Sequence, residues 1–255
     1  MISIITLTYN NFEQLIKTLN SIPKSDIIES IVINGGDCIN TKEFLESYSG
    51  KSISEKDEGI ADAFNKGINL ATGNYIMFIN SGDILIDSKY PENALRILEK
   101  NQNIGFVHSN LLLIDESGTN LIMKPTFSNL GRGMPYLHPT MIVRKSLFET
   151  IGLFNSSIKI AMDFEWIVRL EKNKIKGYYY ASDPVVEMDG RGKSIIQEND
   201  ALKECYLALK ENKLLTLQNI FGFIQRYILF LIRKTLAKLG LGLLLLNLKK
   251  RKYSR

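Results

Sequence analysis

Strand-like and helix-like hydrophobic patterns alternate along the first 80 residues. An apolar, β-branched run covers 2–7, and apolar residues at helical spacing follow at Leu15, Leu19 and Ile22. Such alternation predicts one α/β sheet rather than separate all-α and all-β parts. The same pattern predicts further strands at 27–33, 52–54 and 75–79, and helices at 41–48 and 60–68.

Polar residues follow three of these predicted strands. They are the segments from Thr8 to Asn10, from Asn34 to Asp37 and from Asn80 to Asp83. In open α/β sheets ligands bind beyond the carboxyl ends of the strands, so we expect the three segments to meet at one edge. The chain has no GxGxxG and no GxxxxGK(S/T), and a nucleotide must therefore be held in another way.

Composition predicts one globular core in a reducing compartment. The 255 residues are 45% hydrophobic, enough for one good core and an appendage. Cys38 and Cys205 are the only cysteines, too few for a disulfide framework. Residues 1–5 have no basic segment and run straight into a strand pattern, which is not typical of a signal peptide. We therefore expect a cytoplasmic location.

Charge divides the chain into an acidic body, 1–205, and a basic region, 206–255. The basic region has eleven Lys and Arg against one acid, Glu211, so its net charge is +10 within a total of +5. Its many apolar residues favour a bilayer surface over nucleic acid as the partner. We expect amphipathic helices here that bind an anionic membrane, the alternative being helices that pack on the body or on a second subunit.

A membrane-spanning helix is not the favoured interpretation of this region. A spanning helix needs ~20 predominantly apolar residues. Arg226, Arg233, Lys234 and Lys238 interrupt the apolar run, and Arg226 and Arg233 share one helical face. An interfacial helix fits this pattern better.

The most specific pattern lies at 54–67 and 75–83. It reads SEKDEGIADAFNKG and then YIMFINSGD. A carboxylate at the end of an apolar strand suits a divalent cation that holds a pyrophosphate, because both anions need a cation between them. The pattern resembles the inverting nucleotide-sugar glycosyltransferases of family 2, which carry SExDxGIxDAxNKG and a strand ending NS(D/G)D. The resemblance covers about residues 1–195 and implies a GT-A fold, a mixed sheet flanked by helices.

The resemblance also implies a donor site with a bound Mn²⁺ or Mg²⁺. Asn34 stands where the family usually has an aspartate, and Gly82 where many members have another acid. An asparagine both accepts and donates hydrogen bonds, so a uridine nucleotide still fits. The implied contacts are Thr8 and Asn34 with the base, Asp62 with the nucleotide and Asp83 with the metal, and Asn10, Lys66 and Asn80 are further candidates for substrate binding.

Two of these groups also have a purely structural interpretation. Asp62 and Lys66 lie four residues apart on one predicted helix, which suits a surface ion pair. The run from Asn80 to Asp83 contains only residues that favour turns.

The second half resembles the family's H(Q/P)xxxxRxxLFxxxGxF…xxDxxxxxRL block, from His138 to Leu170. The aspartate of that block, here Asp163, is the general base, which deprotonates an acceptor hydroxyl as it attacks the anomeric carbon and so inverts that centre. Propensity alone would make Asp163 a helix N-cap. His138 is expected either near the acceptor or phosphates or as a buried core histidine.

A late glycine-rich segment runs from Asp189 to Ser194 and resembles a loop of the same family. Arg191 within it is a candidate contact for phosphate charge, and simple solvent exposure is the alternative.

The sequence therefore predicts transfer of a sugar from a nucleotide-diphosphate donor, UDP-linked, to a hydroxyl of a lipid-linked saccharide. The resemblance and the basic region together suggest bacterial surface polysaccharide synthesis (O antigen, capsule or exopolysaccharide) on the cytoplasmic face of the inner membrane, without nucleic acid. One alternative is a nucleotidyltransferase, which would release pyrophosphate. The other is a non-catalytic membrane-binding module with a degenerate site, suggested by Asn34 and Gly82.

Overall fold

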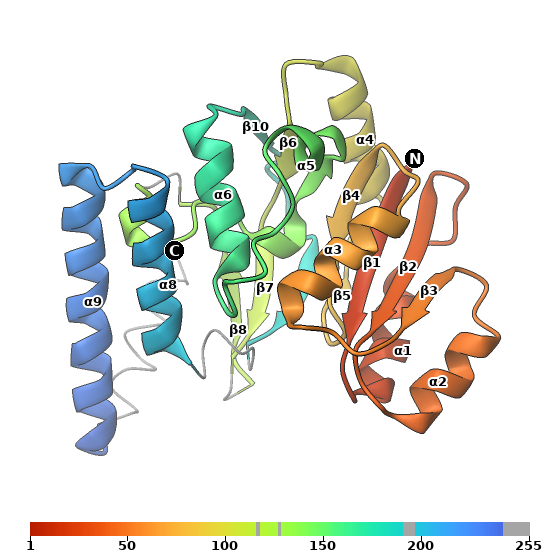
Figure 1. Ribbon diagram of the computed structural model, residues 1–255, viewed down its shortest axis with the longest axis horizontal. Helices are drawn as coiled ribbons and strands as arrows, with labels where there is room; N and C mark the ends of the chain where they lie inside the picture. The colour runs from red at the N-terminus through yellow and green to blue at the C-terminus, as the bar shows by residue number, and fades with distance from the viewer. Residues whose placement is uncertain (116–117, 127–128, 191–196, 242–255) are drawn as a thin grey trace.

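The protein is built around a seven-stranded mixed sheet (Figure 1). The computed structural model describes residues 1–115, 118–126, 129–190 and 197–241. Strand β9 is antiparallel to both of its neighbours, and the other pairs are parallel. In spatial order the strands are β10 (Gly177–Tyr179), β6 (Phe106–His108), β9 (Ile142–Arg144), β4 (Tyr75–Phe78), β1 (Ile2–Thr8), β2 (Ile28–Asn34) and β3 (Lys51–Ser54).

Helices cover both faces of this sheet, so the interior strand β1 is buried on both sides. Alternate residues of β1 point to opposite faces, with Ile4 in one apolar core and Ile5 in the other. The helices beside Ile4 are α1 (Phe12–Ser21), α2 (Ile39–Glu46) and α4 (Tyr90–Lys100); those beside Ile5 are α3 (Ile60–Leu70), α5 (Ser146–Thr150) and α6 (Met162–Lys172). The predicted α/β class and GT-A arrangement are confirmed.

A second, four-stranded sheet brings distant segments together. Its order is β5 (Ile84–Leu85), β11 (Val186–Asp189), β7 (Leu111–Ile114) and β8 (Asn120–Met123). The antiparallel register of β5 with β11 places Glu187 opposite Ile84. The end of β11 therefore lies beside the turn that precedes β5. Two 3₁₀ helices, η1 (Leu130–Arg132) and η2 (His138–Thr140), complete this part of the molecule.

Helices α8 (Glu198–Glu211) and α9 (Leu217–Lys238) follow the sheets. Cys205, Ala208 and Leu209 of α8 belong to the core that α3 and α6 share, so the predicted boundary at 205/206 falls inside a helix packed on the body. Helix α9 packs on η1 and forms one outer edge of the molecule (Figure 1). No helix in the described part of the chain has both the length and the apolar content that crossing a bilayer requires.

Candidate active site

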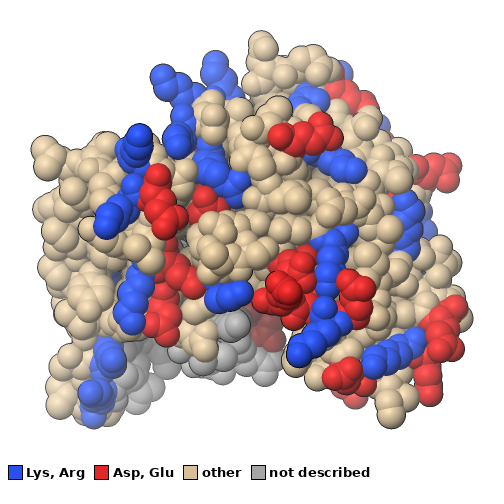
Figure 2. Space-filling view, in the orientation of Figure 1, with Lys and Arg blue, Asp and Glu red and all other residues tan. Residues whose placement is uncertain are grey.

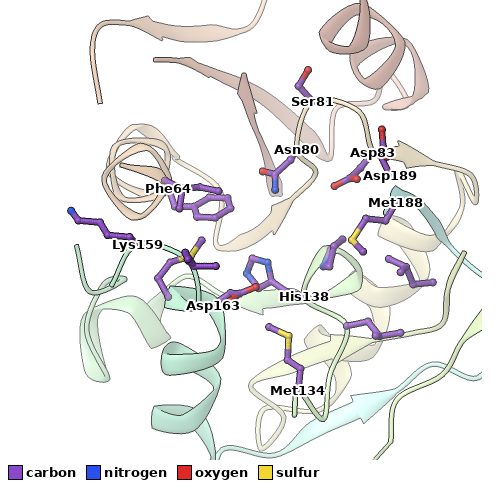
Figure 3. Close-up of a pocket in the computed structure, with 16 residues that line it drawn as sticks. Phe64, Asn80, Ser81, Asp83, Met134, His138, Lys159, Asp163, Met188 and Asp189 are labelled. Atoms are coloured by element: carbon purple, nitrogen blue, oxygen red, sulfur yellow. The ribbon is translucent and has the colours of Figure 1, made fainter. Parts of the chain in front are cut away.

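A pocket of about 440 Å³ lies beyond the carboxyl end of β4. Four residues that the sequence predicts for the site line it together: Asn80, Asp83, His138 and Asp163 (Figure 3). They come from the turn after β4, from η2 and from the first turn of α6. The two carboxylates on which the prediction depends thus share one cavity, although 80 residues separate them in sequence.

Asp83 is almost fully buried, with 6% of its surface exposed. The pKa of its carboxyl is raised to about 7. Burial is the main cause and the charge of Asp189 adds to it, whereas hydrogen bonds from the backbone at Asp189 and Asn80 act in the opposite direction. A carboxyl in such surroundings is costly to ionise unless a cation compensates it. The site therefore favours a bound cation.

Asp189 was not predicted for the site, yet it lines the same pocket beside Asp83 (Figure 3). The register of β5 with β11 brings it there. It is a second acid where Gly82 leaves the turn with only one. No local sequence pattern indicates this pairing, because about a hundred residues lie between the two strands.

The residues around Asp83 fit Mg²⁺ or Mn²⁺. Both are hard cations that take oxygen ligands. Asn80 Oδ1 is buried without a hydrogen-bond partner in the described residues, which leaves it available as a ligand beside the carboxylates of Asp83 and Asp189. No group of three or more His, Cys, Asp and Glu suited to a metal occurs among the described residues, so the amide oxygen is needed to complete a protein donor set.

Asp163 and His138 form the other side of the pocket. Burial raises the pKa of the Asp163 carboxyl, while His138 and a hydrogen bond of 2.7 Å from the backbone N–H of Phe164 lower it. Burial lowers the pKa of His138, and Asp163 acts against this. The His138 ring stacks on Phe78, with ring centroids 5.4 Å apart. His138 is thus both a packed core residue and a pocket residue. The N-cap prediction for Asp163 is wrong, because Ala161 is the N-cap and α6 begins at Met162.

Glu204 of α8 holds the segment that leads into α6. Its carboxylate accepts the backbone N–H groups of Lys159 at 3.0 Å, Ile160 at 2.8 Å and Ala161 at 2.8 Å. Three such hydrogen bonds to one charge fix the start of the helix that carries Asp163. Nothing in the sequence pattern indicated this contact, because the partners are more than 40 residues apart.

Asn34 lies at the end of β2 and is completely buried. Its Nδ2 donates to the carbonyl of Gly36 at 3.2 Å and to Ser54 Oγ at 2.9 Å, and its Oδ1 accepts the N–H of Gly36 at 3.1 Å. The amide group of Asn34 therefore forms hydrogen bonds with the turn after β2 and with β3, and it does not line the pocket.

Asn10 and Thr8 also join loops rather than line the pocket. Asn10 Oδ1 accepts the N–H groups of Asp37 and Cys38, at 2.8 and 3.0 Å, and Thr8 Oγ1 donates to Asn11 Oδ1 at 2.7 Å. Asn10 thus joins the loop after β1 to the loop after β2, and Thr8 at the end of β1 bonds to the loop that follows it. The two loops meet at one edge of the sheet, as predicted, and in this structure the two side chains hold the loops.

The ammonium group of Lys66 is surrounded by three carboxylates of the segment 54–67. Its ammonium group pairs with Asp57 at 2.9 Å, Glu55 at 3.0 Å and Asp62 at 3.1 Å, and these carboxylates raise its pKa against the effect of burial. The Asp57 carboxylate in turn lies so close to Gly35 that a Cβ there would be 1.9 Å from Asp57 Oδ2. Asp62 and Lys66 do form the ion pair that their spacing allows, outside the pocket lining. Arg191 lies outside the described residues.

The chain belongs to glycosyl transferase family 2, whose model matches residues 3–152. It is therefore a glycosyltransferase, an enzyme with a nucleotide-sugar-binding GT-A fold. An uncharacterized glycosyltransferase of Rickettsia bellii is 30% identical over 190 residues, 69% of this chain and 27% of that relative's length. A PGL/p-HBAD biosynthesis glycosyltransferase of Mycobacterium bovis is 24% identical over 184 residues, which is 68% of this chain and 70% of the relative.

Solved structures share the fold. S. aureus TarS 1–349 in complex with UDP-GlcNAc superimposes with a TM-score of 0.68 at 17% identity, over 90% of this chain and 73% of the 1–349 chain. The mannosyltransferase PcManGT of Pyrobaculum calidifontis, in complex with GDP-Man and Mn²⁺, gives a TM-score of 0.61 at 16% identity, over 99% of this chain and 83% of that one.

Proposed function

We propose that this glycosyltransferase moves a sugar from a UDP-linked donor, with inversion, to a hydroxyl of a lipid-linked saccharide during synthesis of a bacterial surface polysaccharide. The observation that carries the proposal is the shared pocket, with Asp83 and Asp189 on one side and Asp163 on the other (Figure 3). The UDP-GlcNAc bound to TarS supports the choice of donor.

Asp163 is the base in this mechanism. It accepts the proton of the acceptor hydroxyl while that oxygen attacks the anomeric carbon from the side opposite the leaving nucleotide, and the centre is inverted. Burial raises the pKa of Asp163, which makes its carboxylate a stronger base than an exposed one. Burial lowers the pKa of His138 beside it, which favours the neutral imidazole, although the charge of Asp163 acts against this.

Asp83, Asp189 and Asn80 Oδ1 would hold a divalent cation on the donor side. When bound, such a cation neutralises the negative charge that collects on a departing diphosphate. The three side chains come from two segments that the β5–β11 pairing fixes, so they are in position before a ligand arrives.

One wall of the pocket is apolar and suits the acceptor. Leu111, Met134, Leu137 and Met188 line it. Methionine adapts to irregular apolar surfaces, so this wall suits the carbon skeleton of a saccharide joined to a lipid.

A donor screen tests the proposal. The purified protein is incubated with single nucleotide sugars, among them UDP-GlcNAc, and with a synthetic lipid-pyrophosphate saccharide, and the products are read by mass spectrometry and by NMR of the new anomeric centre. Free UDP and an inverted linkage support the proposal. Release of pyrophosphate from UTP and a sugar phosphate would support a nucleotidyltransferase, and no turnover of any donor would support a non-catalytic module.

A further inference from the structure

Helix α9 packs on the protein through a mixed face, which includes the buried Phe230, and turns a row of large apolar residues outward. Asn219, Arg226 and Arg233 lie on the side that faces η1 and α8, whereas Ile224 and Ile228 are each 49% exposed. Surface helices of globular proteins normally turn their large apolar residues inward, so an apolar outer side is unusual. Arg226 and Arg233 do share one face, as the sequence predicts, but that face packs on the protein.

The inward contacts fix the rotation of α9 about its axis. Arg226 bonds to Cys205 of α8, and Arg233 pairs with Glu198. Asn219 Oδ1 accepts the N–H of Gly131 at 3.3 Å. Turning the apolar side inward would break these contacts, so the outward apolar side is a property of the folded chain.

The outward side is a continuous apolar surface along more than two turns of the helix. In Figure 2 the edge formed by α9 is mostly free of charge, with Lys and Arg at its lower end. Large exposed apolar patches mark sites of interaction. The side is formed by Phe221, Ile224, Ile228, Leu229, Leu231 and Ile232, each between 44% and 60% exposed.

Close contacts at two glycines join α9 to η1 and to the residue before it. A Cβ at Gly131 would lie 1.9 Å from the Asn219 carbonyl oxygen, and one at Gly222 would lie 2.3 Å from Asn129 Oδ1. Both glycines therefore let α9 press directly on η1. Met134, two residues after η1, lines the pocket on its apolar side. The helix and the acceptor wall thus belong to one packed unit.

We propose that the outward side of α9 docks on a bilayer that contains anionic lipids and so sets the acceptor wall of the pocket beside the membrane. Charge decides between a bilayer and a protein partner. Lys234 and Lys238 are exposed at the end of the apolar side, no acid occurs from 212 to 241, and 249–252 adds four basic residues in sequence. Lysine stems lie along apolar surface while their ammonium groups reach anionic headgroups. The docking stands on α9 alone, whereas its use in presenting an acceptor rests on the proposed function.

Vesicle flotation of the full chain tests the docking. The wild type should float with vesicles of equal parts phosphatidylcholine and phosphatidylglycerol. The triple variant Ile224→Ser, Ile228→Ser, Ile232→Ser should bind at least ~10-fold more weakly, because the three exposed side chains lose the apolar surface that would enter the bilayer. The matched control is Ile39→Ser, Ile86→Ser, Ile122→Ser, three exposed isoleucines away from α9, which should bind like the wild type. Equal loss in both triples would overturn the proposal.

Charge is tested separately. Lys234→Gln with Lys238→Gln should weaken binding to these vesicles ~10-fold and leave binding to pure phosphatidylcholine unchanged, while Lys17→Gln with Lys24→Gln should change neither. Light scattering tests the rival interpretation, in which a second copy of the chain covers the outer side of α9. If the α9 triple variant dissociates a wild-type dimer and neither protein binds vesicles, the rival is correct and the docking proposal fails. Donor binding in solution, without vesicles, reports on the proposed function alone, since α9 does not line the pocket.

Discussion

Two kinds of partly or fully buried carboxylate occur in this molecule, one on β2 of the main sheet and one in the pocket. Glu29 of β2 accepts hydrogen bonds from Ser3 and from Thr72 and pairs with Lys51 at 2.6 Å. Although burial alone would raise its pKa, these partners lower it to about 2. Burial instead dominates at Asp83 and Asp163, whose pKa values are raised. The fold thus stabilises the first carboxylate and leaves the other two for ligands and protons to satisfy.

The largest effect is expected at Asp163. Asp163→Asn keeps the shape but removes the base, so turnover should fall by ~10² or more while donor affinity stays unchanged. Stability should not fall, because a costly buried charge is lost. Steady-state kinetics and thermal melting measure both, with the exposed Asp26→Asn as control. Near-normal turnover in the variant would remove Asp163 from the mechanism.

The same residue predicts a pH dependence. The base must be deprotonated to act, and burial raises its pKa above the usual 3.8. The rate constant kcat/KM should therefore rise with pH across a transition above 3.8, and Glu204→Gln should lower that transition because the Glu204 charge contributes to the raised pKa.

A smaller effect on turnover, with a larger effect on binding, is expected at Asp83. Asp83→Asn should weaken Mn²⁺-dependent donor binding at least ~10-fold in calorimetry and leave the fold intact. In metal-free buffer the variant should be more stable than the wild type at pH 8, by on the order of 1–3 kcal/mol. The folded pKa of about 7 lies above the unfolded value of 3.8, so the wild type loses stability as pH rises between them. Equal metal-dependent binding in both proteins would contradict the assignment.

Glu204→Ala should reduce turnover by ~10-fold through displacement of α6. As a positioning residue, Glu204 should affect kcat more than the donor dissociation constant, and Glu204→Gln should recover part of the loss. The control is Glu211→Gln, an exposed acid on the same helix. A change confined to melting temperature would mean a purely structural role.

The smallest effect is expected at Glu29 of β2, where only stability should respond. Glu29→Gln should lower the free energy of unfolding at pH 7 by about 1–3 kcal/mol and leave kcat unchanged. Because the folded pKa is depressed, this stability is present above 4.5 and is lost as pH falls toward about 2. Denaturant unfolding at pH 7 and at pH 3 measures it, with the exposed Glu46→Gln as control.

Local pattern was enough to predict the strands and helices of the first 80 residues. The pairing of Asp83 with Asp163 in one pocket came from the family resemblance, since no local periodicity links segments that distant. Asp189 and Glu204 were missed because each acts through a long-range register or packing contact. The base contact expected of Asn34 stays a prediction, and its hydrogen bonds to Gly36 and to Ser54 of β3 could not be read from local sequence because they depend on the turn geometry and on the pairing of β2 with β3. For α9, periodicity gave two faces without indicating which one points inward.

The contact between Gly35 and Asp57 has a consequence for engineering. Any side chain at position 35 would displace the Asp57 carboxylate, and with it the ion pair to Lys66. The turn after β2 and the segment 54–67 therefore form one interchangeable module. A chimera that imports either piece alone from a relative should misfit, whereas transplanting both together should preserve the local architecture.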